Sequence, residues 1–265
     1  MKVLITGAAG AIGSTLRTGL AGRYALLRLS DRGELGAAGT GEELAPADLG
    51  DYEAVLAAMR GIDCVVHLGG IPHEAPWPEI LESNIIGAYH MFEAARASGV
   101  RRVIFASSNH AVGFHRVERM LDACSVPRPD SRYAVSKVYG EALGRLYADK
   151  HGMSVACLRI GSFRPLPGDR RQLATWISPR DMTELVRCCI DAPEFRYLVL
   201  YGVSANRRSR WLNRDAARVG YQPRDDAELW ATQLEGRDSG GEAARAFHGG
   251  GFCDLELSNK INDID

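Results

Sequence analysis

The stretch Val3-Leu4-Ile5-Thr6-Gly7-Ala8-Ala9-Gly10-Ala11-Ile12-Gly13 decides the fold of this chain. Its three leading apolar residues predict a buried parallel strand, because both faces of such a strand are hydrophobic. After Gly13 the apolar residues recur at helical spacing. In a strand–turn–helix unit, Gly7 allows a tight reversal, Gly10 lets backbone N–H groups approach a pyrophosphate, and Gly13 lets helix and strand pack closely. The stretch therefore predicts a dinucleotide-binding turn. The alternative is an ordinary β–α turn that binds no ligand.

The composition is that of a globular protein without special segments. A chain of 265 residues, 46% of them hydrophobic and 25% charged, suits one large α/β domain. A formal net charge of −1 argues against nucleic-acid binding as the main role. The apolar runs are strand-sized, shorter than the ~20 residues of a membrane span, and no signal peptide is expected. The six cysteines show no C-x-x-C spacing, so we expect no metal site, no disulfide framework and a cytoplasmic location.

Strand-like and helix-like segments alternate along the chain, which is typical of a doubly wound α/β fold. The expected strands after the first span 25–32, 43–49, 64–68, 102–106, 154–162 and 197–202. The expected helices after the first span 51–60, 80–98, 131–151 and 178–192, with shorter ones at 213–220 and 227–234. We therefore expect a Rossmann-type parallel sheet in a single domain, 1–265. Residues 163–178 and 203–265 are expected to form a smaller C-terminal portion on the substrate side.

Two acidic residues follow the second and third expected strands. Asp31 lies about 20 residues beyond the glycine turn, where a carboxylate accepts hydrogen bonds from the ribose hydroxyls of adenosine. A carboxylate there repels a 2′-phosphate, which favours NAD over NADP, although the charge of Arg32 offsets part of this repulsion. Asp48 is expected to meet the exocyclic amine of an adenine or to cap the helix that starts at Tyr52, and the two roles are compatible.

The carboxyl ends of the next strands carry glycine and small polar residues. Gly69 and Gly70 follow the strand that contains His67, and they allow a second close approach of backbone to cofactor. We expect His67 itself to be a packed strand residue. The run 107–110, Ser-Ser-Asn-His, ends another strand, at the edge where open α/β sheets bind their ligands.

Tyr133 and Lys137 are four residues apart, so they share one face of the expected helix. A phenol with a pKa near ~10 is a poor base at neutral pH, but a nearby ammonium group and a cationic nicotinamide favour the phenolate. A serine hydroxyl close by can hold a reacting hydroxyl beside the tyrosine. Two surface residues of a helix are the alternative interpretation of this common spacing.

Together these motifs resemble the extended, epimerase/dehydratase-like branch of the short-chain dehydrogenase/reductase superfamily. The resemblance covers nearly the whole chain. It rests on residues 6–13, Asp31, Asp48-Leu49, 67–70, Asn84 with Gly87, Ser107-Ser108 and Tyr133-x-x-x-Lys137. Within the branch, the chain is similar to the uronate dehydrogenases through segments 68–71, 80–87, 105–110, 159–162, 175–176 and 201–206.

The resemblance implies NAD-dependent oxidation of the C1 hydroxyl of a hexuronic acid, glucuronate or galacturonate, to an aldarolactone. Tyr133 would be the base, Lys137 would lower its pKa and bind the nicotinamide ribose, and Ser108 would orient the reacting oxygen. The substrate contacts implied are Ser108, Asn109, His110, Tyr133 and Arg171, whose guanidinium suits a carboxylate. The NAD contacts implied are Gly7, Gly10, Ala11, Ile12, Gly13, Asp31, Arg32, Asp48, Leu49, Leu68, Gly69, Gly70, Asn84, Ser107, Tyr133, Lys137, Ile160 and Ser162. The alternative for Arg171 is a solvated loop charge, and for His110 a loop histidine whose hydrogen bonds are satisfied within the protein.

Three departures from the family pattern leave the sugar open. Pro72 stands where the family has a substrate-touching serine, residues 207–213 lack the usual paired tryptophans, and Arg164 adds a positive charge near the expected carboxylate site. The alternative enzyme is an isomerase or lyase with tightly held NAD, acting on a nucleotide-linked sugar, with the arginines of 207–214 on its diphosphate. A third alternative is a nucleotide sensor without activity. Homo-oligomers through the helices 80–98 and 131–151 are also implied.

Overall fold

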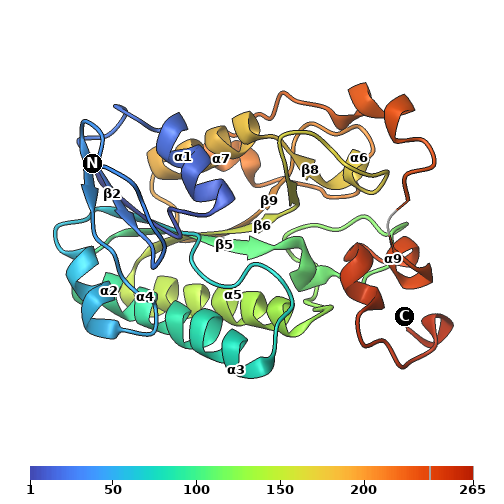
Figure 1. Cartoon of the computed structure of the whole chain (residues 1–265), viewed down its shortest axis with the longest axis horizontal. Coiled ribbons are helices and arrows are strands. Elements are labelled where there is room, and N and C mark those ends of the chain that lie inside the picture. The colour runs from blue at the N-terminus through green and yellow to red at the C-terminus, as the bar shows by residue number, and fades with distance from the viewer. Residues whose placement is uncertain (239, 265) are drawn as a thin grey trace.

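The computed structural model describes residues 1–238 and 240–264 around one seven-stranded parallel sheet (Figure 1). Its strands are β1 Lys2–Thr6, β2 Leu26–Ser30, β3 Glu42–Leu44, β4 Cys64–His67, β5 Arg102–Ser108, β6 Ser154–Ile160 and β9 Tyr197–Gly202. They lie in the order β3-β2-β1-β4-β5-β6-β9, and every neighbouring pair is parallel. The chain runs outward from β1 to β3 and then crosses back to β4, so the strand order reverses beside β1. This confirms the Rossmann-type fold, whose ligands bind at such a switch point.

Helices cover both faces of the sheet (Figure 1). Helices α1 Ala11–Gly19 and α7 Pro179–Asp191 pack on one face, and α2 Tyr52–Met59, α4 Gly87–Ala97 and α5 Arg132–His151 pack on the other. The side chains of β1 show why its sequence is apolar throughout. Val3 and Ile5 belong to one buried cluster and Leu4 to another, and none of the three is exposed to solvent. A strand buried on both faces needs no polar alternation.

The third expected strand is shorter than its sequence suggested. β3 ends at Leu44, and Asp48 and Leu49 lie in the loop that follows it. The neighbouring strand β2 already ends at Ser30, and Pro46 has no N–H to donate to a ladder. The N-cap of α2 is Asp51, which accepts from Ala54 N at 3.1 Å. The capping role considered for Asp48 is therefore wrong.

The long helix expected at 80–98 is divided into three parts. It begins as α3 Trp77–Ile80, continues as a π-helical turn over Leu81–Ile86 and becomes α4 at Gly87. Such π-helical insertions are common at functional sites. Of the two short helices expected near the end, 213–220 contracts to α8 Ala216–Val219, and 227–234 is two 3₁₀ turns, Ala227–Trp230 and Thr232–Leu234.

The remaining segments gather at the carboxyl end of the sheet. Strands β7 Ser162–Phe163 and β8 Trp176–Ile177 form a small parallel pair with α6 Gln172–Thr175 between them. The tail carries α9 Glu242–Ala246 and two 3₁₀ turns, Gly250–Asp254 and Ile261–Asp263, and α9 lies beyond the end of β5 (Figure 1). The division into a single domain, 1–265, with a smaller substrate-side portion at 163–178 and 203–265 stays a prediction. Within the described residues, no helix has the length and apolar character needed to cross a bilayer. All six cysteines are free thiols.

Candidate active site

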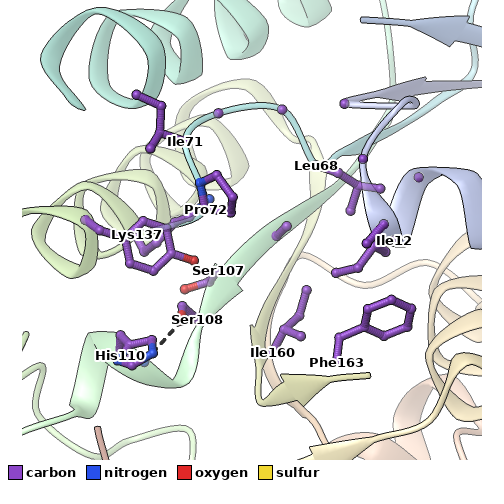
Figure 2. Close-up of a pocket in the computed structure, with 18 of the residues that line it drawn as sticks. Ile12, Leu68, Ile71, Pro72, Ser107, Ser108, His110, Lys137, Ile160 and Phe163 are labelled. Carbon is purple, nitrogen blue, oxygen red and sulfur yellow. Dashed lines mark hydrogen bonds between the residues drawn. The ribbon is translucent and has the colours of Figure 1, made fainter. Parts of the chain in front are cut away.

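A cavity of about 870 Å³ runs along the carboxyl ends of the strands. It brings together almost all of the residues predicted from the sequence. Those that line it are Gly7, Gly10, Ala11, Ile12, Gly13, Asp31, Arg32, Asp48, Leu49, Leu68, Gly69, Gly70, Ser107, Ser108, Asn109, His110, Tyr133, Lys137, Ile160, Ser162 and Arg171. Asn84 is the exception. In Figure 2, Ser107, Ser108 and Lys137 lie across the opening from Ile12, Ile160 and Phe163.

The glycine turn leaves room for nothing larger than glycine at two positions. Gly7 has a φ of +68°, and a Cβ there would lie 2.7 Å from Gly69 N. A Cβ on Gly13 would lie 2.3 Å from Gly7 O, so helix α1 packs directly on the turn. No side chain caps the N-terminus of α1, whose first residues line the cavity. Uncapped N–H groups at a positive dipole end fit the pyrophosphate of a dinucleotide.

Asp31 holds the glycine turn as well as lining the cavity. Its Oδ2 accepts from Ala9 N at 2.9 Å and its Oδ1 from Gly33 N at 2.8 Å. A carboxylate has about four acceptor sites, so each oxygen can still accept from a ribose hydroxyl. The residues thus fit the adenosine half of NAD. The sequence alone does not predict the hydrogen bond from Ala9 N, because that bond depends on how β1 and β2 align side by side.

Asn84 does not line the cavity but holds a loop that does. It is buried in the π-helical turn, where its Oδ1 accepts from Ile71 N at 2.7 Å and its Nδ2 donates to Ser136 Oγ at 3.0 Å. A Cβ on Gly70, whose φ is +123°, would lie 2.8 Å from Asn84 Oδ1. Asn84 therefore fixes the loop at Gly70 and Ile71, and its direct contact with cofactor stays a prediction.

Ser108 ends β5, while Tyr133 and Lys137 belong to α5, and all three line the cavity, where Figure 2 labels Ser108 and Lys137. Lys137 Nζ is 5.5 Å from the Tyr133 ring centroid, which confirms that the pair shares one helix face. Burial raises the pKa of Tyr133 to about 12, while its hydrogen bond with Ser108 opposes that rise. Burial also lowers the pKa of Lys137 to about 8. In the protein without cofactor, the pKa of Tyr133 is therefore raised by burial and not lowered by Lys137 as the sequence analysis expects.

His67 is a packed strand residue, as predicted. Its Nδ1 is 2.8 Å from Thr6 Oγ1, and its ring stacks on Phe105 at a centroid distance of 5.7 Å. Burial lowers the pKa of His67 to about 3, so the ring is neutral at physiological pH.

A buried ion pair that the sequence analysis does not predict lies next to Ser107. Ser107 Oγ donates to Glu141 Oε1 at 2.6 Å, and Arg159 Nε and Nη2 each donate to the Glu141 carboxylate at 2.9 Å. Glu141 and Arg159 are both buried. The available signal was the spacing of Tyr133, Lys137 and Glu141, which places a carboxylate two helical turns after the tyrosine.

Asn109 and His110 follow Ser108 in a 3₁₀ turn and line the cavity. His110 Nδ1 lies 2.7 Å from Oδ2 of Asp130, whose carboxylate is fully buried. The flat face of the His110 ring stacks on the ring of Phe252, with centroids 4.0 Å apart. His110 is therefore held by two neighbours, as the alternative of a satisfied loop histidine expects, and its contact with substrate stays a prediction. Phe252 comes from the glycine-rich tail, where no local pattern pointed to it.

Arg171 precedes α6 and is half-buried at the cavity wall. Its Nη2 donates to His248 O at 2.7 Å. Asn109, oriented so that its amide nitrogen donates to Ile160 O, presents its oxygen to Arg171 Nη2 at 2.9 Å. Among residues 1–238 and 240–264, no carboxylate accepts a hydrogen bond from Arg171. Asp169, in the same cavity, and Asp130 are nevertheless close enough to oppose the lowering of the Arg171 pKa by burial. A half-buried guanidinium with no carboxylate bonded to it is a candidate anion site, in contrast to a solvated loop charge.

The departures at the rim have different consequences. Pro72 and the exposed Arg164 line the cavity. Residues 207–214 do not line it, and Arg207 and Arg208 instead pair with Asp226 and Glu228 at 2.9 and 2.6 Å. These arginines are thus engaged away from the cavity, which counts against their binding a substrate diphosphate there.

Comparison with known proteins agrees with this geometry. Residues 3–179 match the model of the NAD dependent epimerase/dehydratase family. A uronate dehydrogenase of Pseudomonas syringae pv. tomato is 41% identical over 95% of this chain and 92% of its own length. An NAD-dependent glucose-6-phosphate dehydrogenase of Haloferax volcanii is 39% identical over 89% of this chain and 98% of its own. A tyrosine-to-alanine variant of the Agrobacterium tumefaciens uronate dehydrogenase, complexed with NAD, superposes with a TM-score of 0.91 at 41% identity, covering 98% of both chains. The chain therefore belongs to the NAD-dependent epimerase/dehydratase family and is an NAD-dependent oxidoreductase related to the uronate dehydrogenases.

Proposed function

We propose that this enzyme oxidises the C1 hydroxyl of a hexuronic acid to an aldarolactone. The observation that carries the proposal is Arg171, a half-buried guanidinium that bonds to no carboxylate and lines the same cavity as Ser108 and Tyr133. Its Nη1, whose contact with Ser162 Oγ is 3.5 Å long, can donate a charge-assisted hydrogen bond to a carboxylate. The uronate dehydrogenases among the relatives support the same substrate class.

Each residue of the site has a defined task in this proposal. Ser108 donates to or accepts from the reacting hydroxyl and holds it beside Tyr133, which takes the hydroxyl proton. NAD, when bound, accepts the hydride from C1, and its cationic ring favours the phenolate. That help is needed because burial raises the pKa of Tyr133 to about 12. Lys137 supplies an ammonium next to the Tyr133 ring and is placed to bind the nicotinamide ribose.

The test is turnover by the purified protein with NAD, followed by the absorbance of NADH. We expect oxidation of glucuronate or galacturonate, with kcat/KM at least about 100-fold above that for glucose 6-phosphate, because a dianionic phosphate differs from a planar carboxylate in shape and charge. Glucose 6-phosphate belongs in the panel since a relative that acts on it is 39% identical. Preference for the phosphate, or no turnover of either uronate while NAD binds, would reject the proposed substrate. Cofactor that survives purification, with no reduction of added NAD, would favour the isomerase alternative.

We propose that Asp31 selects NAD by accepting from the adenosine ribose. Replacing Asp31 with Asn removes the charge that repels a 2′-phosphate. The expected result is a rise of at least about tenfold in the ratio of kcat/KM for NADP to that for NAD, because each 1.4 kcal/mol of lost discrimination is a factor of ten. Steady-state kinetics with both cofactors measures it. A wild-type ratio that already favours NADP would show that Arg32 dominates.

We also propose a homo-oligomer in a reducing cytoplasm. Helices α4 and α5 lie side by side and expose the apolar side chains Tyr89, Val135 and Leu146. Exposed apolar residues grouped on neighbouring helices favour self-association. Size-exclusion chromatography with light scattering measures the mass, and a monomer at micromolar concentration would reject the oligomer. The free thiols fit a compartment that keeps cysteines reduced.

A further inference from the structure

The tail segment His248–Gly250 lies directly against Arg171. Arg171 Nε and Nη2 donate to the carbonyl oxygen of His248 at 3.2 and 2.7 Å. A Cβ on Gly250, whose φ is +64°, would lie 2.5 Å from Arg171 Nε and 2.6 Å from its Cδ. The tail therefore occupies the Nε edge of the guanidinium. Nη1 has one long contact, 3.5 Å to Ser162 Oγ, a residue that also lines the cavity.

Backbone pairing fixes this segment in place. His248 N donates to His115 O and Gly249 N to Gly113 O, each at 2.9 Å. These hydrogen bonds join the tail to the segment that follows β5. The position of the His248 carbonyl is thus tied to the same part of the chain that carries Ser108 and His110.

Trp211 fixes the side chain of His248. Its Nε1 donates to His248 Nδ1 at 3.2 Å, and His248 Nε2 lies 3.0 Å from Arg119 O. Since the indole N–H can only donate, His248 Nδ1 accepts and Nε2 carries the proton. Burial lowers the pKa of His248 to about 4, which agrees with a neutral ring. Trp211 in turn stacks on Tyr201 at a centroid distance of 5.1 Å.

We propose that Gly250 and Trp211 are positioning residues for substrate recognition. They keep the His248 carbonyl against the Nε edge of Arg171, so that the Nη1 end is presented to the carboxylate of the substrate. An arginine side chain loses rotamer entropy when it is fixed, so a guanidinium that is already fixed binds its anion at lower cost. This inference rests on the proposed function, because it assigns the carboxylate to Arg171.

The first test is Gly250→Ala. The added methyl group cannot share space with Arg171, which must move, and a displacement of about 1 Å at a positioned group can cost as much as about 100-fold. We expect the KM for the uronate to rise about tenfold or more, while kcat changes less and the KM for NAD stays the same. Calorimetry of uronate binding to the enzyme saturated with NADH, in which no hydride transfer to the cofactor can run, should show the same rise in Kd.

Gly61→Ala is the matched control. Gly61 has a φ of +70°, and a Cβ there would meet no atom within 4 Å. It therefore carries the same backbone strain without a contact to Arg171, and its uronate KM should equal that of the wild type. A rise in both variants would show a general effect of strain and would overturn the inference.

Trp211→Phe keeps an aromatic ring beside Tyr201 but removes the N–H donor to His248. It should raise the uronate Kd in the same direction as Gly250→Ala, and it carries the test if the glycine variant does not fold. A wild-type enzyme that oxidises uronates while the folded variants keep its KM and Kd overturns the inference alone. A wild-type enzyme that neither binds nor oxidises uronates overturns the proposed function itself.

Discussion

Replacing Tyr133 with Phe is expected to lower kcat by about 10³-fold and to leave NAD binding within about twofold of the wild type. The substitution removes the phenol oxygen, and general-base catalysis by a positioned side chain contributes about 10²–10⁴-fold. The ring itself remains packed, since Tyr133 is buried with Ala75 and Ile80 and meets His110 edge to face at 6.0 Å. Turnover is measured by NADH absorbance and NAD affinity by calorimetry.

The control for this variant is Tyr139→Phe on the same helix. Tyr139 is half-buried and does not line the cavity, so its phenol should be dispensable for turnover. A Tyr133→Phe enzyme that keeps more than about a tenth of the wild-type kcat would exclude the phenol as the base, whatever its NAD affinity.

The same base predicts a pH profile. Burial raises the pKa of Tyr133 to about 12, so the phenolate fraction grows about tenfold per pH unit at neutral pH. The kcat/KM of the wild type should rise between pH 6 and 8 and level off above pH 8. The levelling is expected because burial lowers the pKa of Lys137 to about 8, and above that pH its ammonium becomes neutral. The residual activity of Tyr133→Phe should lack the rise.

Features with a local physical cause could be predicted from the sequence. Val3, Leu4 and Ile5 had to form a strand buried on both faces, and the steric limits at Gly7 and Gly13 follow from the turn that comes after it. The placing of Ser108 and of the Tyr133–Lys137 pair at one cavity follows from where parallel strands end and from the period of a helix.

Features made by contacts distant in sequence could not be predicted in this way. Phe252 reaches His110 only because the tail pairs with residues 113–117, and no periodicity in a glycine-rich segment reveals that pairing. The role of Asn84 depends on a π-helical turn, which has no distinct apolar spacing. The sequence pattern predicts a strand end at Asp48, but β3 ends at Leu44, because an apolar run near a proline gives an imprecise boundary.

Breaking the buried ion pair between Glu141 and Arg159 is expected to have the largest effect on stability. Arg159 is 2% and Glu141 5% exposed, and their two hydrogen bonds are both 2.9 Å. Glu141→Gln would leave the guanidinium buried without its counter-charge, which typically costs about 3–5 kcal/mol. Urea unfolding should therefore show a fall of that size in the free energy of unfolding, with an unchanged slope if unfolding is two-state.

The double variant Glu141→Leu with Arg159→Met separates a lone buried charge from a loss of packing. With no charge left to desolvate, it should be more stable than Glu141→Gln, since apolar replacements of buried pairs are often neutral. Asp149→Asn on the same helix is the control, because its ion pair with Arg145 at 2.6 Å is exposed and should hardly change the urea midpoint. Loss of less than about 1 kcal/mol in Glu141→Gln would mean that water reaches Arg159.

Because Ser107 Oγ donates to Glu141, the apolar double variant should still lose turnover even where it recovers stability. That outcome would show that the buried carboxylate positions the end of the catalytic strand as well as neutralising the arginine.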